Sequence, residues 1–149
     1  MNTLMPESRR LSNTLYLYTK DCQDVQTQKP GTVHEQQSLV PRYGKVLICR
    51  HCNTLITYTC LAAEIDGTSV HTQCNPSGAL FRYQCYLKAP GCIISGKPTT
   101  EFSWHSGYQW QYAHCTGCHR HLGWFFSGLK PAFFGLLISH LSTITPKDR

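Results

Sequence analysis

Residues 110–126 read Trp110-Gln-Tyr-Ala-His-Cys-Thr-Gly-Cys-His-Arg-His-Leu-Gly-Trp-Phe-Phe126, and this stretch decides the fold. It contains a Cys-x-x-Cys motif, and 62 residues separate this motif from an earlier one. Two thiolates three positions apart can turn inward at a tight loop and occupy two corners of a tetrahedron. Two such motifs therefore predict one structural Zn²⁺ with four cysteine ligands and no open coordination position. The predicted ligands are Cys49, Cys52, Cys115 and Cys118.

Other interpretations of the two motifs remain open. Paired cysteines also occur as redox-active or disulfide-bonded pairs. A nearby histidine could replace one of the four ligands, although histidines close to a metal site are more often surface residues or hydrogen-bond partners of the ligands. The histidines concerned are His51, His114, His119 and His121.

Short segments rich in β-branched and aromatic residues surround the two motifs. Turn-forming residues separate these segments, which is typical of an all-β domain. The expected strands are residues 46–48, 55–59, 79–87, 110–114 and 122–126. Residues 131–142 are ambiguous, because four apolar residues have helical spacing whereas Gly135 disfavours a helix.

Composition limits the class of protein and its organisation. The chain has 149 residues, of which only 15% are charged, and this excludes a coiled coil and a charge-rich disordered chain. The polar residues 1–42 predict a mostly disordered tail, residues 43–145 a single domain, and residues 146–149 a short C-terminal tail. The formal net charge is +6, but the basic residues are dispersed along the sequence, so we expect no nucleic-acid partner. The longest apolar stretch, near residues 133–138, is far shorter than the ~20 residues of a membrane span, so we expect no membrane partner.

The three tryptophans are a second unusual feature, because all of them fall within residues 104–124. Three indole rings brought together can form an open box with flat apolar walls, which suits a small flat ring or a cation. An ordinary aromatic core is the alternative that composition alone leaves open. The three residues are Trp104, Trp110 and Trp124.

The order of these motifs resembles the CULT domain family, the thalidomide-binding domains of cereblon and its single-domain relatives. The matching residues are Cys49-x-x-Cys52, Asn75-Pro76, residues 96–104, 107–110, Cys115-x-x-Cys118, 123–126 and 134–136. The resemblance implies a β-tent, an all-β fold of two small antiparallel sheets set roughly at right angles and pinned by zinc. It also implies that residues 131–142 are β or irregular.

The resemblance further implies a site for cyclic imides of the glutarimide or thalidomide type, including imides at damaged protein C-termini, or for similar flat rings. The tryptophans would form its cage, and the backbone around Phe102 and Trp104 would hydrogen-bond the imide. Cereblon has a histidine in place of Phe102, so we expect weaker binding in this chain and not its loss. The implied ligand-binding residues are Asn75, Phe102, Ser103, Trp104, Tyr108, Trp110, Trp124 and Phe126, with Phe126 as the cage floor, Tyr108 as its support and Asn75 at the rim.

This reading favours a non-enzymatic binding module, and three alternatives accompany it. The first is substrate recognition for a ubiquitin ligase. It would need a separate adaptor protein, because residues 1–42 are too few and too polar to form the segments that dock cereblon onto a ligase. The second is a β-tent redox enzyme such as a methionine sulfoxide reductase, which needs a late reactive cysteine, whereas no cysteine follows Cys118. The third is an RNA-end binder, which the dispersed charge disfavours.

The nine cysteines exclude a purely disulfide-paired monomer, because nine is odd. For the four between the two motifs, the local pairs Cys60–Cys74 and Cys85–Cys92 are one hypothesis, and four free buried thiols are the other. Cys22 is left over in the predicted tail. The extra cysteines suggest secretion, whereas the first ten residues lack the apolar core of a signal peptide, which favours the cytoplasm or nucleus. The compartment stays open.

Overall fold

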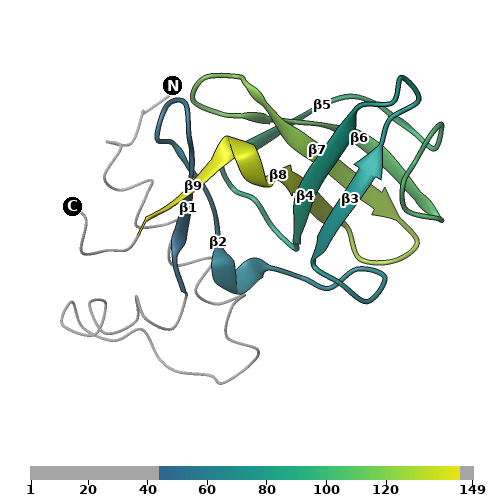
Figure 1. The fold of residues 1–149 in the computed structure, drawn as a ribbon, viewed down its shortest axis with the longest axis horizontal. Helices are drawn as coiled ribbons and strands as arrows, with labels where there is room; N and C mark the ends of the chain where they lie inside the picture. Colours follow the sequence, from purple (N-terminus) through teal and green to yellow (C-terminus); the bar gives the residue numbers. More distant parts are fainter. Residues whose placement is uncertain (1–43, 145–149) are drawn as a thin grey trace, which may run out of the picture. The chain divides into compact units, whose positions relative to one another are not determined.

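The computed structural model describes residues 44–144, which form two antiparallel sheets and contain no α-helix (Figure 1). This part of the chain confirms the predicted all-β class. The two predicted tails and Cys22 lie outside the described residues, and the predicted domain boundaries stay predictions. Within the described range, no helix is long and apolar enough to cross a membrane.

The smaller sheet has three strands and joins the two ends of the described chain. Its order is β2-β1-β9, so that β1 pairs with both neighbours. The apolar residues of β1 are buried in this sheet. The strands are β1 (Val46–Cys49), β2 (Leu55–Tyr58) and β9 (Leu141–Ile144).

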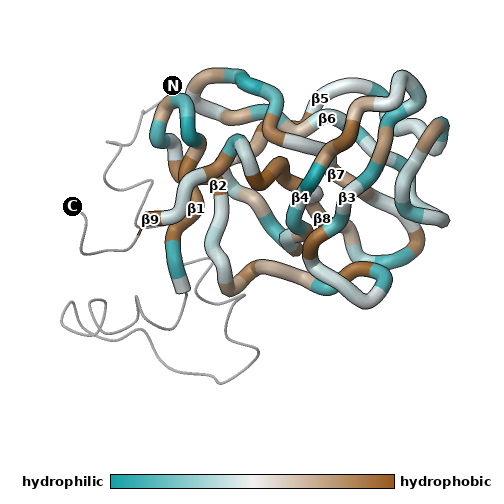
Figure 2. The backbone as a smooth tube through the Cα atoms, viewed as in Figure 1, coloured by the Kyte–Doolittle hydropathy of each residue, from teal (hydrophilic) through white to brown (hydrophobic). Residues whose placement is uncertain are grey.

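The larger sheet has six strands in the order β3-β4-β8-β7-β6-β5. The strands are β3 (Val70–Cys74), β4 (Leu80–Tyr86), β5 (Cys92–Thr99), β6 (Tyr108–Cys115), β7 (His121–Gly128) and β8 (Phe133–Leu137). Every residue of the inner strand β8 is buried, and hydrophobic colouring follows this strand in Figure 2. Two 3₁₀ turns, η2 (Thr59–Leu61) and η3 (Ile138–His140), connect elements of the two sheets.

All five strands expected from the sequence are present, with boundaries shifted by a few residues. The ambiguous residues 131–142 contain β8, η3 and the start of β9, so the helical spacing of their apolar residues was misleading. The sequence did not predict β3 and β5. Both strands lie at edges of the larger sheet and contain no fully buried residue, so their sequences lack the clear apolar alternation of a half-buried strand. Pro98 is tolerated in β5 because an edge strand has unpaired backbone groups.

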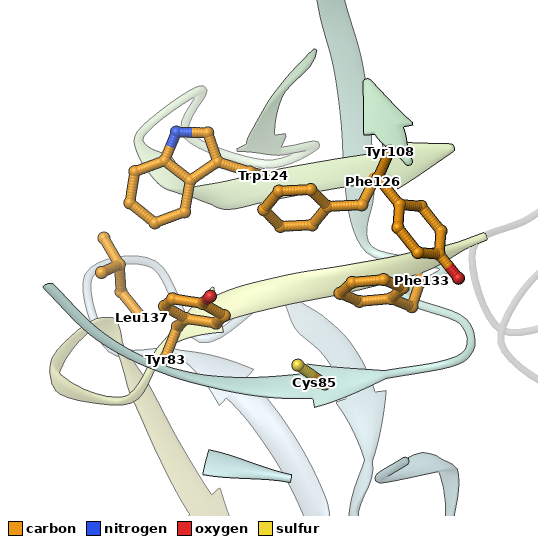
Figure 3. Packing of buried hydrophobic residues seen from close by; sticks show 7 residues of the cluster. All are labelled: Tyr83, Cys85, Tyr108, Trp124, Phe126, Phe133 and Leu137. Carbon is orange, nitrogen blue, oxygen red and sulfur yellow. The ribbon is translucent and has the colours of Figure 1, made fainter. Parts of the chain in front are cut away.

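Aromatic rings from four strands of the larger sheet dominate the core (Figure 3). The rings of Phe126 and Phe133 stack with centroids 4.9 Å apart and planes inclined by 19°. Trp124 belongs to this cluster and is only 7% exposed. The cluster consists of Tyr83, Cys85, Tyr108, Trp124, Phe126, Phe133 and Leu137.

The predicted local disulfides are wrong. Cys74, Cys85 and Cys92 are free thiols, whereas Cys60 is disulfide-bonded, so the alternative of four free thiols does not hold in full either. Strand order explains the error for the second pair, because three strands lie between β4, which carries Cys85, and β5, which begins at Cys92. The first pair fails because its two cysteines lie near opposite ends of β4. Cys74 pairs with Leu80 at the start of β4, whereas Leu61 of η2, the turn that contains Cys60, bonds to Leu87 just after the end of β4.

The close approach of β7 and β8 requires glycine at position 123. Gly123 has a φ of 155°, and a Cβ there would lie 2.0 Å from the carbonyl oxygen of Gly135. We expect Gly123→Ala to lower the free energy of unfolding by about 2–4 kcal/mol, because the backbones must separate in the core. Urea unfolding followed by tryptophan fluorescence measures this change.

Gly78→Ala is the matched control for this substitution. Gly78 also has a positive φ, 89°, but no atom lies within 4 Å of the added Cβ. Its expected cost is that of the left-handed conformation alone, about 1–2 kcal/mol. Equal costs for the two variants would contradict the packing argument.

Candidate metal centre and aromatic cage

The two Cys-x-x-Cys motifs lie at the C-terminal ends of β1 and β6 and in the loops that follow, and the structure brings them together. Their four sulfur atoms all lie within 4.8 Å of one another. The Sγ atoms of Cys49 and Cys118 are 3.7 Å apart, and those of Cys52 and Cys115 are 3.5 Å apart. Among the described residues, this is the cluster of three or more metal-ligating side chains that could hold a metal ion.

The same backbone geometry shapes both loops. The amide of Asn53 donates to the carbonyl of Cys49 over 2.8 Å, and the amide of His119 donates to that of Cys115 over 2.9 Å. Asn53 and His119 have left-handed φ values of 62° and 61°, a conformation in which Asn and His are enriched. Each loop therefore folds back on itself, and the two pairs of thiols converge.

The environment of the thiols differs within the cluster. The hydroxyl of Thr54 lies 3.1 Å from the Sγ atom of Cys52, and this hydrogen bond lowers the pKa of Cys52 to about 6. Burial raises the pKa of Cys49 and Cys115. The amide of Gly117 donates to the Sγ atom of Cys115 over 3.3 Å. The cluster thus combines one thiol with a lowered pKa, Cys52, and two with a raised pKa, Cys49 and Cys115, which a bound cation would have to deprotonate.

A cavity of about 340 Å³ opens on the larger sheet and is walled by aromatic rings. Trp110 and Tyr112 share one face of β6 because side chains alternate along a strand, and Trp124 and Phe126 share a face of β7 for the same reason. The register pairs Trp110 with Phe126 and Tyr112 with Trp124, so the four rings gather on one side of the sheet. The lining residues are Asn75, Pro76, Phe81, Phe102, Trp104, Trp110, Tyr112, His121, Trp124 and Phe126.

Two of the three indole N–H groups are already bonded within the protein. Trp104 Nε1 donates to the carbonyl of Cys74 over 3.0 Å, and Trp110 Nε1 donates to that of Glu101 over 2.8 Å. Trp104 meets Trp124 edge to face, with centroids 4.8 Å apart and planes inclined by 77°. These bonds fix the indole planes and leave aromatic surfaces to form the walls.

The structure brings six of the eight predicted ligand-binding residues to this cavity, and ligand binding by them stays a prediction. Tyr108 and Ser103 do not line it. The hydroxyl of Tyr108 donates to the carbonyl of Pro131 over 3.1 Å, and its ring contacts Phe133 in the core. Ser103 instead donates to the carbonyl of His105 over 3.1 Å. The six residues are Asn75, Phe102, Trp104, Trp110, Trp124 and Phe126.

Sequence analysis missed Pro76, Phe81, Tyr112 and His121 as lining residues. Strand alternation could have identified Tyr112, two positions after Trp110. His121 was considered only as a replacement metal ligand, but its ring lies edge to face with Trp124, with centroids 5.1 Å apart. Its Nε2 lies 2.8 Å from the carbonyl oxygen of Gly123.

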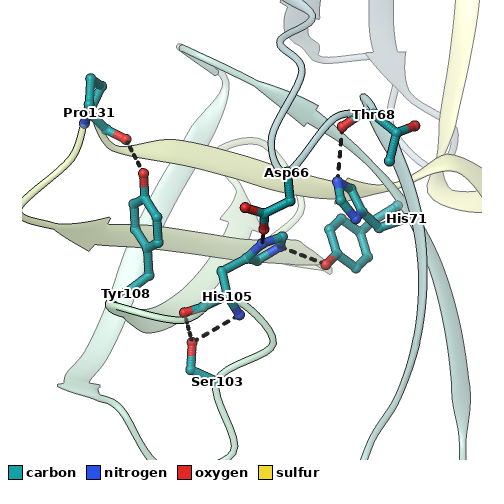
Figure 4. Close-up of polar contacts among 8 residues, drawn as sticks. Asp66, Thr68, His71, Ser103, His105, Tyr108 and Pro131 are labelled. Atoms are coloured by element: carbon teal, nitrogen blue, oxygen red, sulfur yellow. Dashed lines mark hydrogen bonds and ion pairs between the residues drawn. The ribbon is translucent and has the colours of Figure 1, made fainter.

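The buried imidazole of His105 forms hydrogen bonds on both of its ring nitrogens (Figure 4). His105 is 1% exposed, with Nδ1 3.1 Å from Asp66 Oδ2 and Nε2 2.8 Å from the hydroxyl of Tyr83. The carboxylate can only accept, so Nδ1 donates to it and Nε2 accepts from Tyr83. Burial lowers the pKa of His105 and raises that of Tyr83, which keeps both groups neutral. The Tyr83 ring in turn stacks on Trp104, with centroids 5.5 Å apart.

Removing the hydroxyl of Tyr83 is expected to destabilise the domain. Tyr83→Phe leaves a fully buried imidazole nitrogen without its donor, at a cost of about 1–3 kcal/mol in the free energy of unfolding. Tyr112→Phe is the control, because Tyr112 is 45% exposed and we expect its change to stay within about 0.5 kcal/mol. Denaturant unfolding measures the free energy of unfolding of both variants. Equal values would contradict a stabilising role for the hydrogen bond between Tyr83 and His105.

No protein-family model matches this chain. Curated relatives do match it. The protein cereblon of Drosophila willistoni is 39% identical over 101 residues, which cover 61% of this chain and 16% of that protein. Those of Drosophila mojavensis and Drosophila virilis are each 33% identical over 127 residues, which cover 80% of this chain and 18% and 19% of those proteins.

The chain therefore spans less than a fifth of the length of these relatives. On these grounds the chain belongs to the cereblon-like proteins and carries a CULT domain.

Proposed function

We propose that this domain is a non-enzymatic module that binds cyclic imides, such as glutarimide or an imide at a protein C-terminus, in the aromatic cage. The cavity carries this proposal. Its volume of about 340 Å³ lies in the range of small-molecule sites, and tryptophan faces form its walls. A flat ring with apolar faces and polar edges can stack against such walls while backbone groups form hydrogen bonds with its edges.

The backbone beside the cage supplies suitable groups. Among the described residues, neither the carbonyl of Phe102 nor the amide of Trp104 has a hydrogen-bond partner. A cyclic imide has one N–H donor flanked by two carbonyl acceptors, so it can donate to the first group and accept from the second. Phe102 also has a left-handed φ of 56°, which is costly for a bulky side chain and typical of functional sites.

We also propose that the metal of the four-cysteine cluster is a structural Zn²⁺. A tetrahedron with Zn–S distances near 2.3 Å has sulfur atoms about 3.8 Å apart. The two short separations of 3.5 and 3.7 Å are close to that value, and all four ligands are thiols, which Zn²⁺ favours. Bound there, the ion would join the loop after β1 to the loop after β6 and would leave no open position for chemistry.

Calorimetric titration with glutarimide tests the proposed ligand class. N-methylglutarimide is the matched control, because it keeps the ring and loses the N–H donor. We expect glutarimide to bind at least about tenfold more tightly, since one lost hydrogen bond with a desolvated carbonyl costs roughly 1.4 kcal/mol or more. Absence of heat from glutarimide in large excess, or equal affinity for both compounds, would overturn the proposal.

A further inference from the structure

A second cavity, of about 370 Å³, lies where the two Cys-x-x-Cys loops approach the turn η3. We call it the arginine cavity. It differs from the aromatic cage because its lining contains basic and hydroxyl side chains and neither a carboxylate nor an apolar side chain. Its lining residues are Arg50, His51, Arg120, Ser139 and His140.

The Arg50 side chain is held in place by the neighbouring strand β9. Its Nε donates to the hydroxyl of Ser142 over 3.3 Å, and its Nη2 donates to the carbonyl of Leu141 over 3.2 Å. The Arg50 amide also donates to the carbonyl of His140 over 3.0 Å, which ties the first loop to η3. A guanidinium has five N–H donors, so three of them remain for a ligand. Because the side chain is already ordered, binding loses less conformational entropy.

Within residues 44–144, no carboxylate forms an ion pair with an arginine of the arginine cavity. The described residues contain seven Lys and Arg side chains but only three carboxylates, Glu64, Asp66 and Glu101. None of these three forms an ion pair with Arg50 or Arg120 in the described part of the chain. Burial, followed by the charges of Arg120 and Arg50, lowers the pKa of His140. Two guanidinium groups thus line the cavity without a carboxylate among the described lining residues, and an anion could compensate their charge.

We propose that the arginine cavity binds a phosphate monoester or inorganic phosphate as a dianion. Guanidinium groups match phosphate oxygens with paired N–H donors. The Ser139 hydroxyl lies 2.9 Å from His140 Nδ1 and can donate to a ligand in the tautomer in which that nitrogen carries the proton. Arg50 and Arg120 line the cavity, and no other Lys or Arg among the described residues does. This arrangement favours a single terminal phosphate group over the backbone of a nucleic acid, which needs a row of basic side chains.

The competing explanation is that the two arginines only balance the four metal-bound thiolates. The experiment separates these explanations with metal-loaded protein in chloride buffer of constant ionic strength. The titrants are inorganic phosphate, a phosphoserine peptide, its unphosphorylated counterpart and an RNA oligonucleotide. The variant is Arg120→Gln, and the control is Lys130→Gln, which removes an exposed charge outside the cavity. Bound metal is quantified in each protein.

We expect saturable binding of phosphate or of the phosphopeptide, weakened at least tenfold by Arg120→Gln and unchanged by Lys130→Gln, with equal metal content. Tighter binding of the phosphopeptide than of inorganic phosphate would indicate that the site binds a phosphorylated protein. Similar affinities for the two would indicate that it binds the free phosphate ion. No binding, equal weakening in both variants, or tighter binding of an RNA oligonucleotide would overturn the proposal. So would an effect of Arg120→Gln on metal content alone. None of these outcomes depends on imide binding in the cage.

Discussion

Removal of the metal from the four-cysteine centre is expected to unfold residues 44–144. Structural Zn²⁺ contributes about 10–16 kcal/mol in zinc-finger peptides, whereas a whole domain is stable by only about 5–15 kcal/mol. Cys49 and Cys115 end β1 and β6, one strand from each sheet, and Cys52 and Cys118 lie in the loops that follow, so loss of the ion would remove a link between the two sheets. Circular dichroism and thermal unfolding after chelation measure the effect.

Cys115→Ser should reproduce the effect of chelation without a chelator, because it removes one of the four thiolates. Cys74→Ser is the matched control, since Cys74 is a free and exposed thiol outside the cluster. We expect the first variant to lack a cooperative unfolding transition and the second to unfold like the unaltered protein. A chelated protein with an unchanged transition would contradict the structural role of the metal.

Replacement of Trp110 is expected to have the largest effect on ligand binding. Trp110 lies on β6, lines the cavity and is only partly buried, so its loss removes a cage wall without removing a member of the buried core cluster. Aromatic residues at the centre of a binding site commonly contribute 2 kcal/mol or more, so we expect Trp110→Ala to weaken glutarimide binding at least about thirtyfold.

Two comparisons separate this effect from general damage to the fold. Trp110→Phe keeps an aromatic face and should weaken binding less than Trp110→Ala. Leu129→Ala changes a fully exposed side chain outside the cavity and should leave affinity unchanged. Calorimetry gives the affinities, and unfolding curves show whether each variant is folded. Equal affinity of folded Trp110→Ala and the unaltered protein would exclude a cage role for this tryptophan.

Much of the fold could be predicted because its inner strands have strong local signals. Segments such as Leu122–Phe126 combine buried apolar residues with strand-forming side chains, and turn residues separate them. The edge strands β3 and β5 escaped prediction because they bury little of their surface. The segment around β8 was ambiguous because a fully buried strand carries apolar residues on both faces, which periodicity alone does not distinguish from a helix.

The candidate sites show where sequence order stops being informative. The two Cys-x-x-Cys motifs predicted the four-cysteine cluster, although paired redox-active or disulfide-bonded cysteines remained open until the structure brought the four thiols together. Local spacing failed for Cys85 and Cys92, because sheet order and not sequence distance separates them. The arginine cavity was also hidden, since Arg50 and Arg120 are far apart in the chain and meet only through the two loops. Two basic residues that are far apart in the sequence, Arg50 and Arg120, therefore line the same cavity in the folded domain.

The crystal structure of this domain with glutarimide tests the central claim most directly. The account predicts the imide ring between Trp104, Trp110 and Trp124, with its N–H donating to the carbonyl of Phe102 and one ring carbonyl accepting from the amide of Trp104. It also predicts a tetrahedral metal ion on the four cysteines. An empty cage at saturating ligand, or glutarimide bound elsewhere on the domain, would contradict it.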